Sequence, residues 1–153
     1  MTIAIEAPRQ RELLELLRLS DEYALSLYPA ESCYLLDVGD LEGPDVTVFV
    51  SRAVSGMANG MAALVNRRDG SGELKRMFVL DSARGRGVAR ALLAVIEECA
   101  GAQGIHTLQL ETGPKQLDAV ALYKSAGFRS IPNFGPYVGD QFSVCMEKRL
   151  PES

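Results

Sequence analysis

The segment of this 153-residue chain with the clearest capacity for chemistry is a loop with two glycines and two arginines, Arg84-Gly85-Arg86-Gly87-Val88-Ala89. It follows an apolar stretch with strand character and precedes a run with helical spacing. Glycine allows a backbone to approach a ligand closely, and the free N–H groups at a helix start favour an anion. The pattern predicts a diphosphate-binding loop, with an ordinary glycine-rich turn as the alternative.

Two common nucleotide-binding motifs do not fit this loop. The dinucleotide-binding fingerprint G-x-G-x-x-G needs a third glycine where Arg90 stands. It also needs an acidic residue about 20 positions further on, and Glu111 lies 24 residues after Gly87. The motif G-x-x-x-x-G-K-[ST] is absent from the sequence. A dinucleotide-dependent dehydrogenase and a P-loop nucleotidase are therefore disfavoured.

Strand and helix patterns that mix along the chain must position this loop. The fold class expected is α/β, or α+β, with a mixed sheet, because strand–helix–strand crossovers fill the second half. No linker or repeat interrupts the chain, so residues 1–153 are expected to form a single domain. Strands are expected over 2–6, 46–54, 57–65, 73–80, 105–111, 128–131 and 141–150; helices from Pro8, over 20–27, from 87 to about 101 and over 114–126; and a loop over 30–44.

Composition excludes several classes of function. Sixteen Lys and Arg against 20 Asp and Glu give a net charge of −4, which argues against nucleic acid as a partner. The three cysteines and one histidine predict neither a disulfide framework nor a metal site. No apolar run is long enough for a membrane span, and the first residues do not resemble a signal peptide. A cytoplasmic location is therefore expected.

Two separated motifs resemble the GNAT superfamily of N-acetyltransferases. Arg84-x-x-Gly87-x-Ala89 is similar to the family's [QR]-x-x-G-x-[GA] signature, at the expected place after the fourth strand. In the segment 121–128, ALYKSAGF, residues 122–128 match the L-Y-x-x-x-G-F part of the family's A-x-L-Y-x-x-x-G-F pattern. The resemblance covers nearly the whole chain, and the stretches ELKRMFV, LETG and IPNFGPYVGDQFSVCMEKRL resemble a bacterial branch of uncharacterised small-molecule acetyltransferases.

The resemblance implies a fold and a cosubstrate. It implies the acyl-CoA N-acyltransferase fold, with acetyl-CoA held by residues 84–89 and no metal. In this family a bulge separates the fourth strand from the fifth, and pantetheine enters the gap. Backbone groups of Phe78 and Val79 are then expected to bond the pantetheine arm and the acetyl oxygen. Gln116 stands where many relatives carry an asparagine that bonds the pantetheine amides.

The resemblance also suggests catalytic groups. Tyr123 matches the tyrosine that protonates the leaving thiolate, and it shares a helical stripe with Ala119; the alternative is a buried core tyrosine. Glu73 matches the position of the base in histone-type members, and Glu111 is its rival. Regular alternation along the strand predicts that Glu73 shares one face with Val79.

Three functions stay open at this stage. The first is transfer of an acetyl group to the amine of a small or amino-acid-like acceptor by direct attack in a ternary complex. The second is a non-catalytic acyl-CoA-binding or sensing module, and the third is a protein N-acetyltransferase. Aromatic residues near the C-terminus, Phe134, Tyr137 and Phe142, suit either a wall of the acceptor pocket or a homodimer interface.

Overall fold

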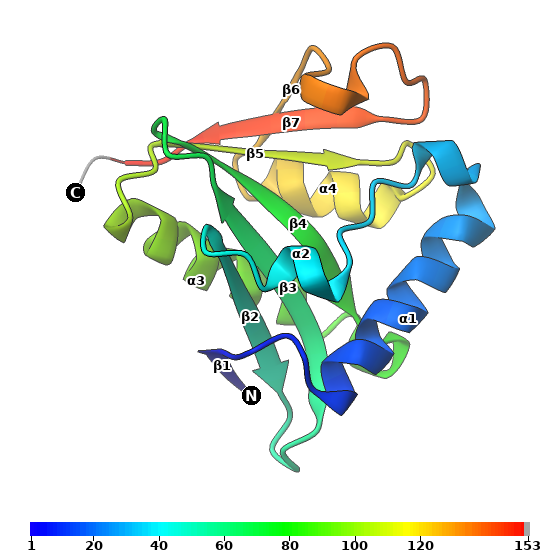
Figure 1. The fold of residues 1–153 in the computed structure, drawn as a ribbon, viewed down its shortest axis with the longest axis vertical. Coiled ribbons are helices and arrows are strands. Elements are labelled where there is room, and N and C mark those ends of the chain that lie inside the picture. The colour runs from blue at the N-terminus through cyan, green and yellow to red at the C-terminus, as the bar shows by residue number, and fades with distance from the viewer. Residues whose placement is uncertain (152–153) are drawn as a thin grey trace.

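Seven strands form one mixed sheet in the computed structural model, which describes residues 1–151 of the chain (Figure 1). The strand order is β1-β2-β3-β4-β5-β7-β6. Only β4 and β5 pair in parallel among these described strands, and every other pairing is antiparallel. The strands are β1 (Thr2–Ile5), β2 (Val46–Arg52), β3 (Ala58–Asn66), β4 (Ser71–Val79), β5 (Thr107–Thr112), β6 (Arg129–Ile131) and β7 (Val144–Arg149).

Helices cover both faces of the sheet. In the view of Figure 1, α1 (Arg11–Leu27) and α2 (Val38–Leu41) lie in front of it, and α3 (Val88–Ala102) and α4 (Leu117–Ser125) lie behind it. The front core joins leucines of α1 to alternate residues of β2 and β3. The back core joins the apolar stripe of α3 to the other faces of the same strands and to Tyr123 of α4. Three single 3-10 turns span 30–32, 81–83 and 135–137.

The mixed sheet and the order of elements expected from the sequence are confirmed, with two local corrections. The two helices expected between Pro8 and Leu27 form one continuous helix that starts at Arg11, because Leu13, Leu16 and Leu17 bury one stripe and the polar side chains face outward. The stretch 30–44 is not a plain loop. It contains α2, which is capped by Asp37.

A bulge in β4 breaks the regular alternation of its side chains. Arg76 has a φ of 57°, which is the left-handed region that a non-glycine residue rarely adopts. The expectation that Glu73 shares a face with Val79 is therefore wrong. Lys75, on the face of Glu73, contacts residues in front of the sheet, whereas Val79 packs into the back core. The parallel pairing of β4 with β5 ends at Leu74 and Leu110, just before the bulge.

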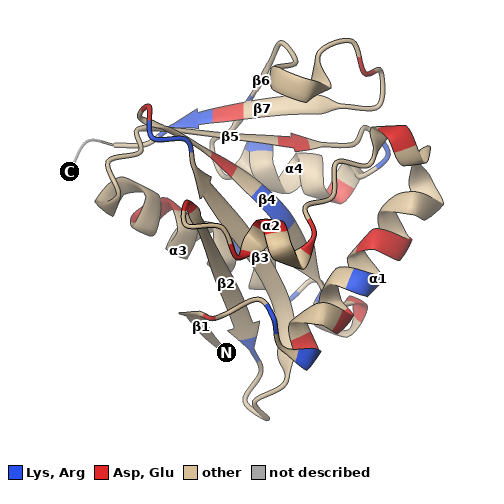
Figure 2. Cartoon of the chain, viewed as in Figure 1, with Lys and Arg blue, Asp and Glu red and all other residues tan. Residues whose placement is uncertain are grey.

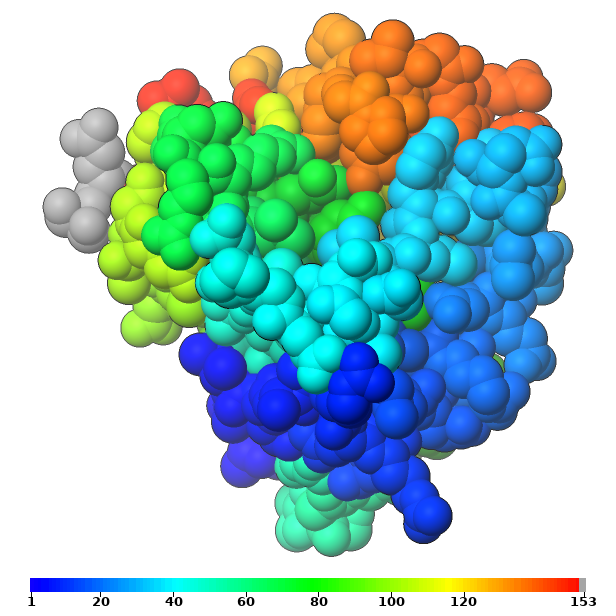
Figure 3. Space-filling view, in the orientation of Figure 1, coloured from blue at the N-terminus to red at the C-terminus, as the bar shows by residue number. Residues whose placement is uncertain are grey.

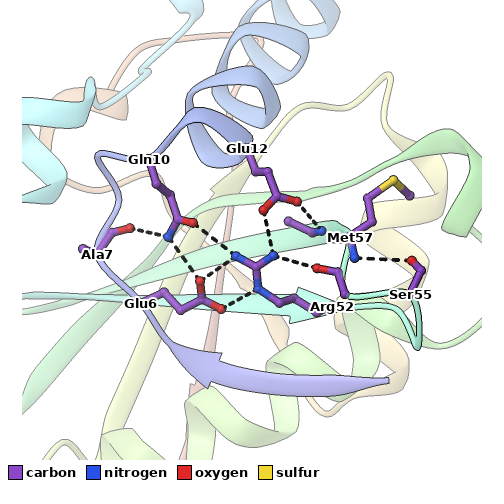
Figure 4. A network of polar contacts seen from close by, with 9 residues as sticks. Glu6, Ala7, Gln10, Glu12, Arg52, Ser55 and Met57 are labelled. Carbon is purple, nitrogen blue, oxygen red and sulfur yellow. Dashed lines mark hydrogen bonds and ion pairs between the residues drawn. The ribbon is translucent and has the colours of Figure 1, made fainter.

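The guanidinium of Arg52, at the end of β2, links that strand to the segment after β1, to α1 and to the turn before β3 (Figure 4). Its Nε and Nη2 donate to the Glu6 carboxylate at 2.9 and 2.8 Å, and Nη1 donates to Glu12 and to the Gly56 carbonyl at 2.8 and 2.7 Å. Glu12 also accepts the Ala58 N–H at 2.9 Å. The hydrogen bonds from Arg52 lower the pKa of Glu6, and those from Ala58 and Arg52 lower the pKa of Glu12.

Replacing Arg52 with methionine is expected to lower the urea midpoint of unfolding at pH 7, because two carboxylates lose their donors. Their pKa values lie below the ordinary value in the folded state, so their contribution is present at neutral pH and is lost as pH falls through the lowered values. The difference from the unmodified protein should therefore narrow between pH 7 and pH 3.

Arg9→Met is the matched control for this measurement. Arg9 forms an ion pair with Glu42 through side chains that are 57% and 40% exposed, against 23% and 21% for Arg52 and Glu6. Solvent screens the exposed pair more strongly, so its loss should matter less. Equal midpoint changes in the two variants, or a change in Arg52→Met that does not depend on pH, would contradict the importance of the Arg52 network.

Candidate active site

A cleft of about 840 Å³ opens where β4 and β5 separate. Residues of α1 and the segment after it line the cleft, as do β4 beyond Leu74, the loop before α3, the end of β5, and α4. Since α1 and α4 cover opposite faces of the sheet, the cleft connects those faces through the gap between the two strands. Its volume is typical of small-molecule sites.

The loop before α3 presents its backbone to the cleft. Gly85 and Gly87 have φ values of 75° and 80°, and an added Cβ would meet no atom within 4 Å at either position. The first helical hydrogen bond of α3 runs from Ala91 to Gly87, so the N–H groups of 88–90 have no partner among the described residues. Free N–H groups at the start of a helix, next to glycines, form an anion-binding site.

The two arginines of this loop occupy different positions. Arg84 lines the cleft, donates from Nε to the Val79 carbonyl at 3.3 Å, and stacks over the Tyr23 ring at 5.3 Å. Arg86 is exposed and is not among the described residues that line the cleft. Gly85, Gly87, Val88 and Ala89 line it, as do Phe78 and Val79 of β4.

Tyr28, the residue after α1, holds the loop between β5 and α4 against the front of the molecule. Its hydroxyl accepts a hydrogen bond from the backbone N–H of Lys115 at 3.1 Å and donates one to the side-chain oxygen Oε1 of Gln116 at 3.4 Å. The same Gln116 oxygen accepts the Gly113 N–H at 3.2 Å. The Tyr28 ring lies so close to Gly113 that a Cβ there would collide with it. Gln116 lines the cleft, and its side chain is held in place by hydrogen bonds from Tyr28 and Gly113.

Tyr123 of α4 reaches the cleft from the back core. Its side chain is almost completely buried, and its helical stripe with Ala119 faces the core as expected. The hydroxyl has no hydrogen-bond partner within residues 1–151, although the residue lines the cleft. Burial raises the pKa of this phenol, so the hydroxyl is protonated at neutral pH.

Glu111, at the end of β5, lies in the same cleft. Burial raises its pKa to about 7, while the nearby Ser143 hydroxyl and the Lys75 ammonium act in the opposite direction. Ser143 is close enough to influence the carboxylate without reaching hydrogen-bond geometry, since its Oγ is buried and has no partner among the described residues. A carboxylate with a pKa near neutral can both accept and release a proton at physiological pH.

Glu73 stands in a different environment, although it lies on the neighbouring strand. Arg67 Nη2 donates to it at 2.9 Å, the Tyr137 hydroxyl donates to it at 2.6 Å, and Lys75 Nζ lies 3.6 Å away. Among the described residues that line the cleft, Glu111 is present and Glu73 is not. The structure thus places Glu73 in a charge cluster beside the cleft and Glu111 inside it.

Two segments distant in sequence form the front wall of the cleft. The Asp140 carboxylate accepts hydrogen bonds from Ser32 and Tyr34 at 3.2 and 2.6 Å, so 30–44 and the segment before β7 meet in front of β4. Figure 3 shows these segments, light blue to cyan and orange, side by side. Of the aromatic residues noted near the C-terminus, Phe142 lines the cleft, and Tyr137 packs edge-on against Tyr34.

Two basic residues at the bulge of β4 were not expected to line the cleft. Lys75 and Arg76 do so, and Figure 2 shows this basic stretch of β4 following an acidic position on the same strand. The pattern of the strand contains no signal for them, because only the bulge turns both side chains toward the front of the sheet.

The sequence also led to expectations about metal sites, membrane spans, oligomeric state and location. Residues 1–151 contain no group of three or more metal-ligating side chains. In the same range, no helix is both long and apolar enough to cross a membrane. The homodimer and the cytoplasmic location stay predictions.

Comparisons with known proteins agree on one family. A sequence model described as "Acetyltransferase (GNAT) family" matches residues 11–128. The "IAA acetyltransferase" of Azospirillum brasilense is 44% identical over 151 residues, which is 98% of each chain. A crystal structure from Klebsiella pneumoniae assigned as an acyl-CoA N-acyltransferase superposes with a TM-score of 0.83 at 34% identity, covering 97% of each chain. An N-acetyltransferase from Thermoplasma acidophilum, solved with coenzyme A, superposes with a TM-score of 0.76 at 18% identity, covering 97% of this chain and 99% of its own.

Gly87→Glu is expected to weaken binding of coenzyme A about tenfold or more, measured by titration calorimetry. The substitution places a negative charge and a side chain where the diphosphate should lie. Gly104→Glu is the control, because Gly104 follows the other end of α3 with a φ of 81° and equally open surroundings. The control carries the same charge and backbone strain and should bind normally. Unchanged affinity in Gly87→Glu would contradict the diphosphate assignment.

Proposed function

This chain belongs to the acetyltransferase (GNAT) family and is an N-acetyltransferase, and from that premise we propose that it transfers the acetyl group of acetyl-CoA to the amine of a small acceptor by direct attack in a ternary complex. The observation that carries the proposal is the separation of β4 from β5 beyond Leu74 and Leu110. The resulting cleft joins the anion-binding loop to Glu111 and Tyr123.

Acetyl-CoA fits the back half of this cleft. The free N–H groups of 88–90 and the open surroundings of Gly85 and Gly87 suit a diphosphate. Beyond Leu74, β4 has lost its partner on the β5 side, so the N–H of Val79 on that edge is available to the amide groups of pantetheine, whereas Phe78 is paired with Met61 of β3. Donor recognition through backbone groups in an open strand edge resembles the addition of a further strand.

Glu111 is the proposed general base. An amine must lose a proton before it attacks the thioester carbonyl, and a carboxylate with a pKa of about 7 accepts protons more readily than an ordinary one. Glu73, the position expected from histone-type members, accepts hydrogen bonds from Arg67 and Tyr137. Those two donors occupy both of its carboxylate oxygens, and Glu73 is not among the described residues that line the cleft. Glu111, which the sequence offered as the alternative to Glu73, is therefore the proposed general base.

Tyr123 is the proposed general acid. Attack of the neutral amine forms the new C–N bond and breaks the C–S bond, and the departing thiolate needs a proton. The Tyr123 phenol is protonated, faces the cleft and has no competing hydrogen bond within the described chain. The nitrogen then loses its second proton, which restores the Tyr123 phenol by way of solvent, and the proton taken up by Glu111 is released to solvent. The products are the acetamide and free coenzyme A.

Release of free coenzyme A across a panel of small amines tests the proposal, with Glu111→Gln as the decisive variant. We expect the substitution to lower kcat/KM for the acceptor on the order of 10²–10⁴-fold. In the unmodified enzyme, kcat/KM should rise as pH increases through about 7, because the ionised form of Glu111 is the base. The variant should lose that step and still bind acetyl-CoA normally.

Glu73→Gln is the matched control for Glu111→Gln, since it makes the same change on the neighbouring strand. It should cost less activity and leave the pH step near 7 in place. A normal Glu111→Gln with a crippled Glu73→Gln would return the base to β4. Normal activity in both would mean that the acceptor loses its proton directly to water.

Tyr123→Phe is expected to leave the affinity for acetyl-CoA nearly unchanged while lowering kcat on the order of 10²–10⁴-fold, because only the proton donor is removed. Steady-state kinetics across the pH range, together with calorimetry, separates the two effects. Tyr23→Phe, which removes a hydroxyl from α1 at the rim of the same cleft, is the control and should retain kcat. Normal turnover in Tyr123→Phe would reduce Tyr123 to a packing residue.

A further inference from the structure

We propose that the acceptor carries a carboxylate as well as its amine, and that Arg76 binds this carboxylate in the front half of the cleft. The inference rests on the proposed function, because it concerns the acceptor of the same reaction. It specifies the acceptor class as an apolar or aromatic amino acid.

The guanidinium of Arg76 is buried but only partly paired. Its side chain is 2% exposed, Nη2 lies 2.7 Å from Asp21 Oδ1, and Nη2 also donates to the Leu17 carbonyl at 3.2 Å. Nε and Nη1 are buried and have no hydrogen-bond partner among residues 1–151. Leaving charged donors unpaired away from water is costly, and native proteins rarely do so without a reason. Arg76 is among the residues that line the cleft, so a ligand carboxylate that reaches Nε and Nη1 would supply the partner that these donors lack.

The backbone at Arg76 is held in an unfavourable conformation. A φ of 57° is strained for a residue with a long side chain, and such strain persists where the surrounding structure enforces it, commonly at functional sites. The bulge turns Arg76 to the front of the sheet, where it meets α1. Glu111 and Arg76 both line the cleft, so the proposed base and the proposed carboxylate site share one space.

The other charged groups nearby already have partners. Lys75 Nζ donates to the Tyr137 hydroxyl at 2.7 Å and to the Tyr34 carbonyl at 3.3 Å, and it lies 3.6 Å from Glu73. Arg67 bonds the same glutamate at 2.9 Å. Arg76 thus retains the free donors at this end of the cleft, while Glu111 is available to the amine.

Aromatic side chains supply the rest of the acceptor wall. Tyr28, Tyr34 and Phe142 line the front half of the cleft, and the Tyr28 and Phe142 rings lie 6.1 Å apart in a tilted arrangement. Such a wall favours an apolar or aromatic side chain on the acceptor. Together with an amine site at Glu111 and a carboxylate site at Arg76, it matches the three parts of an amino acid.

Matched pairs of acceptors test the inference: phenylalanine with phenethylamine, tyrosine with tyramine, and leucine with 3-methylbutylamine. Each pair differs by the carboxylate, and coenzyme A release gives kcat/KM for both members. We expect the preferred pair to show at least about a tenfold advantage for the amino acid. Arg76→Gln should remove that advantage by raising KM for the amino acid, and should lower kcat/KM for the decarboxylated amine by a smaller factor.

Two further variants distinguish a lost contact from a damaged fold. Arg76→Lys keeps the positive charge and should retain part of the preference, even if Arg76→Gln unfolds. Arg18→Gln, which removes an exposed arginine of α1 paired with Glu15, should behave like the unmodified enzyme. Preference for the decarboxylated amines, or equal loss for both members of a pair in the Arg76 variants, would overturn the inference while acetyl transfer stands. No transfer to any amine, despite normal binding of coenzyme A, would overturn the proposed function and this inference with it.

Discussion

The active site depends on the point at which β4 stops pairing with β5. Two parallel strands normally continue side by side until one of them ends. Here the ladder closes at Leu74 and Leu110, and the bulge at Arg76 directs the rest of β4 away. This single interruption creates the cleft, frees the β4 edge for the donor, and gives the front and back of the sheet access to the same space. Glu111 enters that space from the front and Tyr123 from the back.

Two glutamates beside this opening show how environment separates similar groups. Glu73 and Glu111 lie on adjacent strands and face the front of the sheet. Glu73 is hydrogen-bonded to Arg67 and Tyr137 and is not among the described residues that line the cleft. Glu111 has been removed from water with less compensation, and its pKa rises to about 7. Position along the strand suggested Glu73 as the base, whereas solvation and pairing favour Glu111.

Local chemistry was predictable from sequence where it depends on nearby residues. The glycine loop, the helix that follows it and the inward stripe of Tyr123 all reflect contacts within a few positions, and they lie where the sequence placed them. The bulge at Arg76 was not predictable in the same way, because alternation along β4 continues through it in the sequence. Tyr34 and Asp140, which close the front wall, are 106 residues apart, and no local pattern links them.

The two halves of the site are built from different kinds of group, and this has a consequence for specificity. The donor half relies on backbone N–H groups at 88–90 and on the open edge of β4, which many sequences can provide. The acceptor half relies on side chains from α1, the bulge and the segments joined at Asp140. Changes in those side chains can alter which acceptor binds without disturbing the binding of the acetyl donor. The link between the halves is Tyr28, whose hydroxyl holds the loop that follows Glu111. A change in the acceptor side chains that keeps this contact therefore keeps the loop after Glu111 in place.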